Sequence, residues 1–496
     1  MGDIMQKESL WKQYQNHKRY PSLTKGITCD VLIIGGGITG ISCAFELSNS
    51  NQKIVLIDQN QIGQGITSGT TGKLTYLQNG IYQKLLHTFG EEIALTYYQS
   101  QKEAIQTVEK YVNQYHIDCN FQKDISYLFA TTRKEKDTLQ IEKAFLKRNQ
   151  IPYIYEKTNP FCRSRGAIKV PDTAVFHPLK YLYHLAELAY KRGVQIYEKT
   201  KAVGFKDYEN NVIVDTERGY IRAKKVVFAC HYPFFLLPGL FPLRAHIERS
   251  YVCAGKVKDA GNGNAINPSN PTYSFRYHKD KNKFLIYCGA SHKLGDHLDY
   301  QENYRLLTEQ AKEFMPNVDY IWQNQDIMTN DYLPLIGRLQ KNNDHLYIAT
   351  GYNTWGMTNG VIAGKVIRDL ILGEENPYAF LFAPYRGIHF DQIKNFTLDA
   401  YQSGKSYAIS KLKNYYSFYL DEVKIRKKKG KKLGIYIDED GKYHIVSTIC
   451  PHMKCSLTFN MFQKTWDCPC HGSRFDMEGK CIEGPSLKDI TIIEKI

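Results

Sequence analysis

Apolar and polar positions near the start of the chain follow the order of a strand, a turn, a helix and a second strand. A short apolar run covers residues 30–34 (DVLII), and a glycine-rich turn, GGGITG, follows it. The next residues, ISCAFELS, have the apolar spacing of a helix packed on one side, and a second apolar run covers residues 53–57. This pattern predicts a β-α-β unit of a parallel sheet.

Further apolar runs extend this mixed pattern over most of the chain. Residues 91–111 and 179–191 have the apolar spacing of helices. Residues 212–215, 224–229 and 345–350 are short apolar runs that predict strands. The periodicity weakens after residue 377, and residues 386–413 are typical of a connecting segment. From about residue 415 short runs alternate with turns, and GIYIDEDGKYHIVS predicts a hairpin with its bend at Asp440-Gly441. We therefore expect a large α/β part and a small all-β domain.

Composition sets the scale of these parts. The chain has 496 residues, of which 43% are hydrophobic, and this is enough for two or three buried cores. No stretch approaches the roughly 18 to 20 unbroken apolar residues of a membrane-spanning helix. The first residues lack the apolar core of an export signal. We expect a cytoplasmic protein without a transmembrane segment.

A formal net charge of +15 raises the question of an acidic partner. The densest basic run covers residues 424–432 (KIRKKKGKK), and no nucleic-acid-binding motif accompanies it. We interpret the charge as a solvated surface and expect no nucleic-acid partner.

The glycine turn has the spacing of a dinucleotide-binding fingerprint. Gly35 permits a tight turn, Gly37 lets a pyrophosphate approach the backbone at the helix N-terminus, and Gly40 brings helix and strand together. Asp58 follows the second strand at the expected distance of about twenty residues, where it can accept a hydrogen bond from a ribose hydroxyl. The flanking elements favour a dinucleotide site over a structural turn.

The cysteines form two groups. Seven are scattered without paired spacing and are expected to be small core residues: Cys29, Cys43, Cys119, Cys162, Cys230, Cys253 and Cys288. The other five follow Ile449, where Cys450 and His452 are spaced C-x-H and Cys468 and His471 are spaced C-x-x-H. Two thiolates and two imidazoles suit the two irons of a [2Fe-2S] cluster. A Cys2His2 zinc site is the alternative, although zinc sites favour C-x2-4-C and H-x3-5-H pairs.

The surroundings of these ligands, CPHMKC and WDCPCHGSRFD, resemble the Rieske iron-sulfur signature over most of residues 415–496. The resemblance implies that Cys450 and Cys468 hold one iron of a [2Fe-2S] cluster and that His452 and His471 hold the other.

The same resemblance concerns four residues beside the ligands. Cys455 and Cys470 occupy positions where high-potential Rieske proteins have a disulfide, and two free thiols are the alternative. Ser473 matches a serine whose hydroxyl bonds a bridging sulfide, whereas Phe475 stands where those proteins have tyrosine. Since one hydrogen bond is lost, we expect a potential in the lower-middle of the Rieske range of about −150 to +300 mV.

The first 375 residues resemble the FAD-dependent amine and amino-acid oxidase family, which includes D-amino acid oxidase, glycine oxidase and sarcosine oxidase. The resemblance is carried by the glycine turn with Asp58 and by the runs GITSGTTG, TERGYIRAKKVVFACHYP and ATGYNTWGMTNGVIAG. It implies FAD as the cofactor and a helix that begins at the last of these runs with its dipole toward the flavin ring. The further cofactor contacts that it implies are Gly65, Thr67, Ser68, Gly72, Val203, Gly351, Gly356, Met357 and Thr358.

The two resemblances together imply the fold class. We expect an α/β Rossmann-type FAD-binding domain with an inserted α+β substrate domain, plus a small C-terminal all-β Rieske domain. The expected boundaries are 28–85, 175–235 and 320–375 for the FAD-binding domain, 86–174 and 236–319 for the substrate domain, 386–413 for the linker and 415–496 for the Rieske domain.

One departure from the family concerns the substrate. Family members that act on amino acids often carry an arginine before a D-x-x-P-x-I-G block, where it binds the substrate carboxylate. Residues 322–326 (WQNQD) precede the block that begins at Asp331, and they contain no arginine. Arg276 is a candidate substitute, although an arginine at the surface of a sheet is the favoured interpretation. His292 and His297, in a loop-like segment, are expected to be solvated.

FAD accepts two electrons as a hydride, whereas a Rieske cluster takes one electron at a time. We therefore predict an FAD-dependent oxidoreductase that oxidises a small-molecule substrate at a C–N or C–O bond. Electrons then pass singly through the cluster to a one-electron acceptor, a protein or a quinone-like molecule. The alternatives are a Rieske oxygenase, a non-enzymatic redox sensor and an electron-transfer reductase that works in the reverse direction. In that reductase NAD(P)H reduces the flavin and the cluster is an outlet to its one-electron partner, an acceptor or donor. A second dinucleotide fingerprint, which an NAD(P)H-dependent reductase would carry, is missing.

Overall fold

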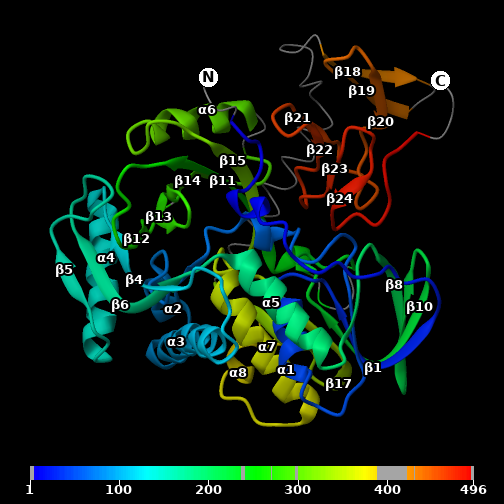
Figure 1. Ribbon diagram of the computed structural model, residues 1–496, viewed down its shortest axis with the longest axis horizontal. Helices are drawn as coiled ribbons and strands as arrows, with labels where there is room; N and C mark the ends of the chain where they lie inside the picture. Colours follow the sequence, from blue (N-terminus) through cyan, green and yellow to red (C-terminus); the bar gives the residue numbers. More distant parts are fainter. Residues whose placement is uncertain are drawn as a thin grey trace.

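The computed structural model contains two large sheets that share a mixed α/β body and a smaller all-β unit beside them (Figure 1). It describes residues 5–492 except 236–238, 240, 270, 297–299, 388–421 and 429–430. Most of the predicted linker, 386–413, and the predicted start of the last domain near 415 lie outside the described residues. No helix in the described ranges has the length and apolar character needed to cross a bilayer.

The first sheet is mainly parallel and contains the predicted β-α-β unit. Its strand order is β16-β17-β10-β1-β2-β7, and β9 pairs with β10 and β8. Buried β-branched and leucine residues form the inner strands, as expected where both faces are covered, one by helices and the other by residues of β9, β11 and β15. The bounds are β1 Ile27–Ile34, β2 Ile54–Ile57, β7 Gln195–Tyr197, β8 Ala202–Tyr208, β9 Asn211–Thr216, β10 Gly219–Phe228, β16 Leu335–Gln340 and β17 Asn343–Thr350.

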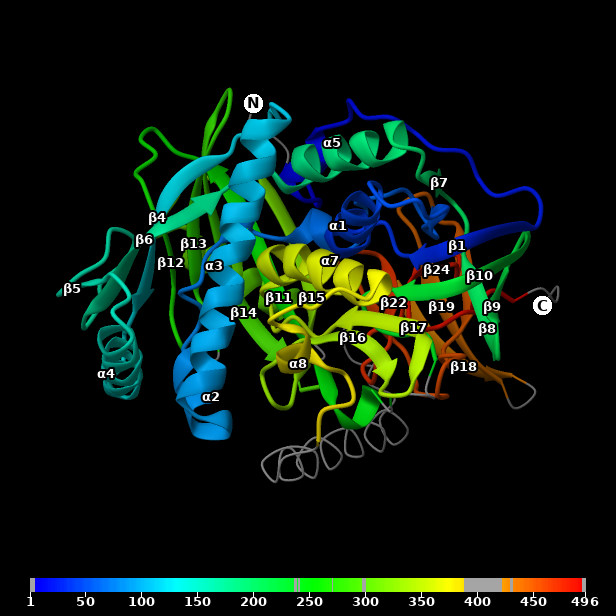
Figure 2. The same cartoon turned by 90° about the horizontal axis from the view of Figure 1, so that it is seen from below.

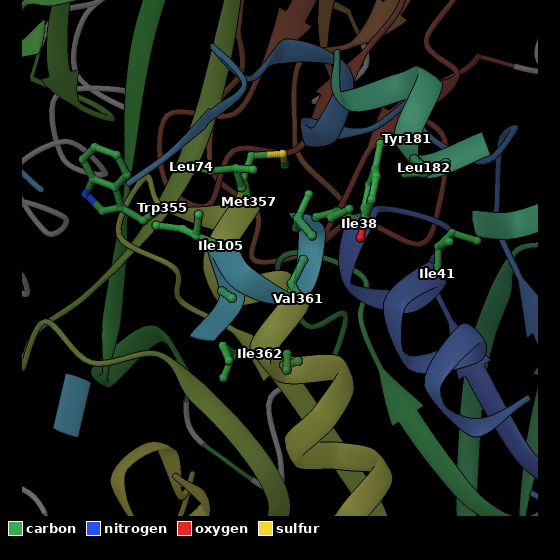
Figure 3. Close-up of a cluster of buried hydrophobic side chains, with 14 of the residues drawn as sticks. Ile38, Ile41, Leu74, Ile105, Tyr181, Leu182, Trp355, Met357, Val361 and Ile362 are labelled. Atoms are coloured by element: carbon green, nitrogen blue, oxygen red, sulfur yellow. The ribbon is translucent and has the colours of Figure 1, made fainter. Parts of the chain in front are cut away.

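Helices α1 (Ile38–Leu47), α5 (Pro178–Lys191) and α7 (Gly356–Leu372) pack together against this sheet (Figure 2). Figure 3 shows Ile38 of α1, Val361 of α7 and Tyr181 of α5 in one apolar cluster. The helices α1 and α7 approach closely where α7 has Gly364. A Cβ at this position would lie only 2.8 Å from Ser42 Cβ, so a side chain would push the helices apart. The cluster thus fixes the start of α1 and the start of α7, which both face the cavity described below.

The second sheet has the strand order β15-β11-β14-β13-β12-β4-β6-β3, with β5 on β6. Its bounds are β3 Lys73–Leu74, β4 Gln122–Phe129, β5 Ile154–Glu156, β6 Ala167–Val175, β11 Ala245–Lys256, β12 Asn264–Ile266, β13 Ser274–Lys279, β14 Lys283–Lys293 and β15 Tyr320–Thr329. Strand β15 was assigned from the sequence to the FAD-binding part, yet it hydrogen-bonds to β11 over its whole length. The chain therefore returns to the first sheet after Thr329 rather than at residue 320.

Five further helices lie in the part of the chain that the structure describes: α2 Ile81–Phe89, α3 Glu91–Gln114, α4 Arg133–Arg148, α6 Tyr300–Ala311 and α8 Ala379–Phe382. The N-terminal segment packs on the loop between β2 and β3, because fully buried Trp11 donates from its indole nitrogen to the Thr70 carbonyl at 2.6 Å.

The smaller unit consists of two antiparallel sheets around a core of its own, which contains Trp466, Tyr436 and Phe459. The predicted hairpin is confirmed by the pairing of β19 with β20, and Gly441 at its bend has a φ of 77°. The bounds are β18 Val423–Lys428, β19 Lys431–Ile437, β20 Tyr443–Ser447, β21 Thr458–Asn460, β22 Thr465–Asp467, β23 Arg474–Phe475 and β24 Cys481–Glu483. Figure 1 shows this unit, in orange and red, beside β11 and β15.

Candidate functional site

A cavity of about 600 Å³ has walls from all three parts of the fold. The first sheet contributes the loops after β1, β2 and β17, and the second sheet contributes residues of β11, β14 and β15. The smaller unit contributes Gln463, Arg474 and residues 482–487. Cavities of about 300 to 1,000 Å³ are typical of cofactor and ligand sites.

The predicted glycine turn forms one end of this cavity. Gly35 has a φ of 115°, and a Cβ there would lie 2.4 Å from the Ala229 carbonyl oxygen. A Cβ at Gly40 would lie 1.8 Å from the Gly35 carbonyl oxygen, so Gly40 is a packing glycine. Gly37 precedes α1 and lines the cavity. Backbone N–H groups at the start of α1 can therefore meet an anion there, as a pyrophosphate requires.

Asp58 lies beside this turn at the end of β2. Its Oδ2 accepts a hydrogen bond from the Gly36 N–H at 2.7 Å, and its Oδ1 accepts one from the Asn60 N–H at 2.7 Å. Burial raises the pKa of Asp58 to about 6, and these two hydrogen bonds oppose that rise. The carboxylate faces the cavity and has lone pairs left for a ribose hydroxyl.

The second predicted loop continues the wall from the glycine turn. Gly65, Thr67 and Ser68 line the cavity, and Thr67 Oγ1 accepts a hydrogen bond from the Ile38 N–H at 3.0 Å. A Cβ at Gly65 would meet nothing within 4 Å, so this backbone is open to a ligand. The loop is held from the second sheet, because Trp322 Nε1 donates to the Gly69 carbonyl at 2.8 Å.

The start of α7 forms another part of the wall. Gly351, Gly356 and Met357 line the cavity, and Gly351 has a φ of 73°. Thr358 is buried behind them and donates to Gln101 Oε1 at 2.5 Å. The positive end of the α7 dipole thus points at the cavity, where negative charge on a ligand is favoured.

Four predicted cofactor residues are outside the wall that the described residues form, namely Gly40, Gly72, Val203 and Thr358. Gly72 has a φ of 71° and supports the loop through its carbonyl, and the wall near Val203 is formed by residues 200–202. The remaining set, with its open backbone and helix N-termini, fits a dinucleotide such as FAD.

Two charged groups in the cavity wall were not identified from the sequence. Lys73 is 6% exposed and donates to Ser274 Oγ, and burial lowers its pKa to about 8.

Asp326 lies directly opposite Glu248 across β15 and β11, and both line the cavity. Burial, together with the Glu248 charge, raises the pKa of Asp326 to about 7. The sequence signal for Asp326 is its place in the alternating run Trp322, Asn324, Asp326. This signal identifies a cavity residue only if the face of β15 that meets the cavity is known.

Two expectations about charged residues are wrong. Arg276 is 1% exposed, and its Nη1 donates to the carbonyls of Thr71 at 2.5 Å and Gly72 at 2.9 Å. It is therefore neither a surface residue nor a substrate clamp, and it holds the cofactor loop. His292 is buried in β14 and stacks on Tyr251 at 5.7 Å between ring centroids. His297 lies outside the described residues.

The seven scattered cysteines are free thiols, and the prediction that they are core residues is confirmed for only part of them. Four of them are buried core residues: Cys29, Cys43, Cys119 and Cys253. Cys162 is partly exposed, whereas Cys230 and Cys288 are partly exposed and line the cavity, which the sequence did not indicate.

The four predicted metal ligands come together in the smaller unit. Cys450 and Cys468 are each 1% exposed, and the Cys468 thiol hydrogen-bonds to Cys450, which lowers the pKa of Cys450 below its usual value. The His452 and His471 rings are nearly perpendicular, with centroids 5.0 Å apart. Both Nδ1 atoms are buried and have no hydrogen-bond partner among the described residues. Buried, unsatisfied nitrogens beside paired thiols are the donors that a cluster with two cysteine and two histidine ligands would take.

The electrostatics of the histidines support the same assignment. Burial lowers the pKa of both rings, and for His471 burial and the neighbouring His452 bring it to about 4. Both imidazoles are therefore neutral at pH 7, the form in which histidine binds a metal. The [2Fe-2S] cluster would be held by Cys450 and Cys468 on one iron and by His452 and His471 on the other.

The predicted disulfide is present between Cys455 and Cys470. Cys468 Sγ lies within 4.8 Å of both of these sulfurs, but the disulfide leaves only Cys468 of the three as a ligand. Ser473 is fully buried, and its Oγ accepts a hydrogen bond from the Ser486 N–H at 3.0 Å. Phe475 is fully buried in the same core and offers no hydroxyl.

The cluster site and the cavity meet at one place. The rings of Tyr232 and His471 lie 6.2 Å apart between centroids, and Tyr232 lines the cavity. Gln325 also lines the cavity, and its Nε2 donates to the carbonyl of Gly472, the residue after His471, at 3.2 Å. One predicted ligand of the cluster, His471, is thus next to the cavity wall.

Comparison with known families agrees with both sites. The family described as FAD dependent oxidoreductase (DAO) matches residues 30–370, and the Rieske [2Fe-2S] domain family matches residues 413–494. The protein YhfW of Bacillus subtilis (strain 168), whose name describes a Rieske 2Fe-2S iron-sulfur protein, is 33% identical over 98% of this chain and 97% of its own.

Two further relatives match the first part. The gamma-glutamylputrescine oxidoreductase of Escherichia coli (strain K12) is 24% identical over 74% of this chain and 89% of its own. The crystal structure of glycine oxidase from Geobacillus kaustophilus has a TM-score of 0.61 at 19% identity, and it covers 73% of this chain and 99% of that one. The chain therefore belongs to the FAD-dependent oxidoreductase family and carries a Rieske [2Fe-2S] domain after its flavin-binding part.

Proposed function

We propose that this FAD-dependent oxidoreductase oxidises a small amine at a C–N bond and passes the electrons one at a time through the Rieske cluster to an acceptor. The observation that carries the proposal is the shared boundary of the two sites, at which His471 lies beside Tyr232 of the cavity wall. FAD, when bound, supplies two-electron hydride chemistry, and the cluster supplies one-electron transfer.

The electron balance explains the fusion of the two domains. Oxidation of an amine to an imine removes a hydride from carbon and a proton from nitrogen. The two electrons of the hydride leave through the cluster singly, so each substrate molecule reduces two one-electron acceptor molecules. A quinone-like acceptor would take both electrons in two successive steps.

Charge in the cavity favours a cationic amine over an amino acid or a hydroxy acid. Asp326 and Glu248 face the cavity side by side, and the arginine that binds a substrate carboxylate in family members is absent from residues 322–326. An ammonium group next to two carboxylates would also lower the pKa of Asp326 from about 7 and keep it charged. The relative that is named for γ-glutamylputrescine, itself an amine, supports the same substrate class.

Lys73 has a separate part in this proposal. Its ammonium lies in the wall near Trp355, 5.6 Å from the ring centroid. At this position a cation would stabilise negative charge that develops on a reduced flavin ring. It would repel a cationic substrate head group, which leaves the Asp326 side for the amine.

The test is anaerobic mixing of the FAD-loaded protein with a panel of diamines, monoamines, amino acids and hydroxy acids. We expect diamines or monoamines to bleach the flavin absorbance, and amino acids and hydroxy acids to leave it unchanged. Bleaching by NADH or NADPH alone would instead support the reverse direction, and bleaching by hydroxy acids alone would contradict the C–N assignment.

A further inference from the structure

Strands β11 and β15 form a paired ribbon whose side chains reach both the cavity and the Rieske domain. Successive side chains of a strand point to opposite faces. Glu248 and Asp326 are paired across the ribbon and line the cavity. The next pair, Arg249 and Gln325, hydrogen-bonds to the Rieske domain, and Gln325 also lines the cavity. A single pair of strands thus contacts both the proposed substrate position and the cluster loops.

Arg249 and Gln325 form a continuous polar chain to the cluster loop. Arg249 Nη1 donates to Asp467 Oδ2 at 2.8 Å, and both side chains are fully buried. Arg249 Nη2 donates to Gln325 Oε1 at 3.1 Å, and Gln325 Nε2 donates to the Gly472 carbonyl at 3.2 Å. Asp467 and Gly472 each adjoin a cluster ligand in the sequence.

We propose that this chain of Arg249, Gln325, Asp467 and Gly472, the docking clamp, holds the Rieske domain in one fixed position during turnover, with His471 as the ligand that receives electrons from the flavin side. The inference rests on the proposed function, because it concerns the same electron transfer. It means that the domain does not leave the flavoprotein to carry electrons to the acceptor.

The burial of the ion pair argues for a fixed position. Two charges removed from water are stabilised by their mutual attraction. Separating the Arg249–Asp467 pair would leave an uncompensated charge on each surface, which costs free energy. Asp467 is also bound at its other oxygen, because Oδ1 accepts hydrogen bonds from Thr465 Oγ1 at 2.7 Å and from Arg474 Nε at 3.3 Å. A domain that swung away at every turnover would have to break this pair and rehydrate both ions each time.

The fit at Gly472 argues in the same direction. Its φ is 72°, and a Cβ there would lie 2.7 Å from Gln325 Oε1 and 3.0 Å from Ile247 Cδ1. The backbone of the cluster loop therefore touches the ribbon without room for a side chain. This close approach places the peptide after His471 against the cavity wall.

Contacts from other elements hold the domain at two more places. Phe462 stacks on Tyr304 of α6 with centroids 3.8 Å apart, and Lys201 Nζ donates to the Leu487 carbonyl at 2.8 Å. Together with the clamp, these contacts oppose rotation of the domain. The acceptor then has to approach the other ligand loop, where Met453, next to His452, is 47% exposed.

The experiment uses the full-length protein with both cofactors. The bound FAD is reduced by a light flash in the presence of EDTA, and reduction of the cluster is followed by its absorbance at increasing sucrose concentration. We expect a first-order rate in the wild type that does not change with viscosity. In Arg249→Met and Gln325→Leu the rate should fall, by roughly 10- to 100-fold for Arg249→Met because the docked state becomes a minor population.

A matched control and a second readout keep the test decisive. Arg305→Met removes an arginine that is 55% exposed on α6, and it should leave the rate unchanged. Hydrogen exchange of the amides in residues 466–474 should accelerate in Arg249→Met while the Rieske EPR signal persists. If Arg249→Met does not fold, the charge-neutral double variant Arg249→Met/Asp467→Leu takes its place.

The outcomes separate this inference from the proposed function. A wild-type rate that falls with viscosity, or clamp variants that transfer electrons at the wild-type rate, would overturn the fixed dock. If the flash reduces FAD but never the cluster in wild type, the proposed electron path fails. The clamp is then judged by exchange alone, and unchanged exchange in Arg249→Met would refute it.

Discussion

The flavin cavity draws its wall from segments between Lys7 and Leu487, whereas the four cluster ligands lie between Cys450 and His471. The cluster loops are supported by their own apolar core and by a disulfide within the same unit. The cavity depends on two sheets and on the domain that closes part of it. A substitution at the cluster should therefore act locally, whereas one at the cavity should report on several parts of the fold.

The largest expected effect concerns the local site. His471→Cys adds a thiolate that stabilises ferric iron, so the reduction potential should fall on the order of 200–400 mV, toward that of four-cysteine clusters. An EPR-monitored redox titration measures this change, and FAD content should stay at the wild-type level. Met453→Leu, beside a ligand but not one itself, is the control. An unaltered Rieske signal in His471→Cys would contradict the ligand assignment.

Gly37→Val tests the distributed site. A Cβ at Gly37 would meet only Thr67 Oγ1, at 3.3 Å, so the protein itself nearly accommodates a side chain there. A pyrophosphate bound at the start of α1 would collide with the valine side chain, so the amount of bound FAD should fall about tenfold or more. The released flavin is quantified after denaturation, with Gly204→Ala on β8 as the control. Full FAD content in Gly37→Val would place the pyrophosphate elsewhere.

Asp326→Asn tests the substrate end of the cavity. With a cationic amine, kcat/KM should rise with pH through about 7 as Asp326 loses its proton. The variant should lose this rise and about tenfold or more in kcat/KM, since a buried charge partner is removed. Glu248→Gln should have a smaller effect, because Glu248 already contacts His246 at 3.4 Å. An unchanged pH profile in Asp326→Asn would count against the amine site.

The same carboxyl has a consequence for stability that needs no substrate. Its pKa is raised from 3.8 in the unfolded chain to about 7 in the folded protein. Between these values the native state holds a proton that the unfolded state has lost, so the free energy of unfolding falls as pH rises. Denaturant titrations from pH 4 to 7 should show a weaker fall in Asp326→Asn than in wild type.

The smallest expected effect is again local. Phe475→Tyr adds a hydroxyl in the buried core next to Cys450 and Cys468. One hydrogen bond toward the cluster side contributes ~0.5–1.5 kcal/mol, which corresponds to a rise of about 20–60 mV in the potential. Protein-film voltammetry can resolve this shift. A potential that falls or stays constant would mean that the hydroxyl does not reach the cluster side.

The same contrast explains what the sequence could predict. The four predicted cluster ligands and the glycine turn could be singled out because each motif occupies a few adjacent residues and carries its own turns. Arg276 and His292 were misjudged, since the direction of a strand side chain depends on register and on which face the neighbouring layer covers. Lys73 and Asp326 carry no local motif, and only the pairing of β11 with β15 brings Asp326 to Glu248.

The central claim is that electrons from the substrate leave the flavin side through the cluster of the same chain. Rapid-freeze EPR after anaerobic mixing of the full-length protein with an amine that bleaches the flavin tests it most directly. We predict that the Rieske signal appears as flavin absorbance recovers, with a first-order rate that is independent of protein concentration. Flavin that stays bleached while the cluster stays oxidised would contradict the account.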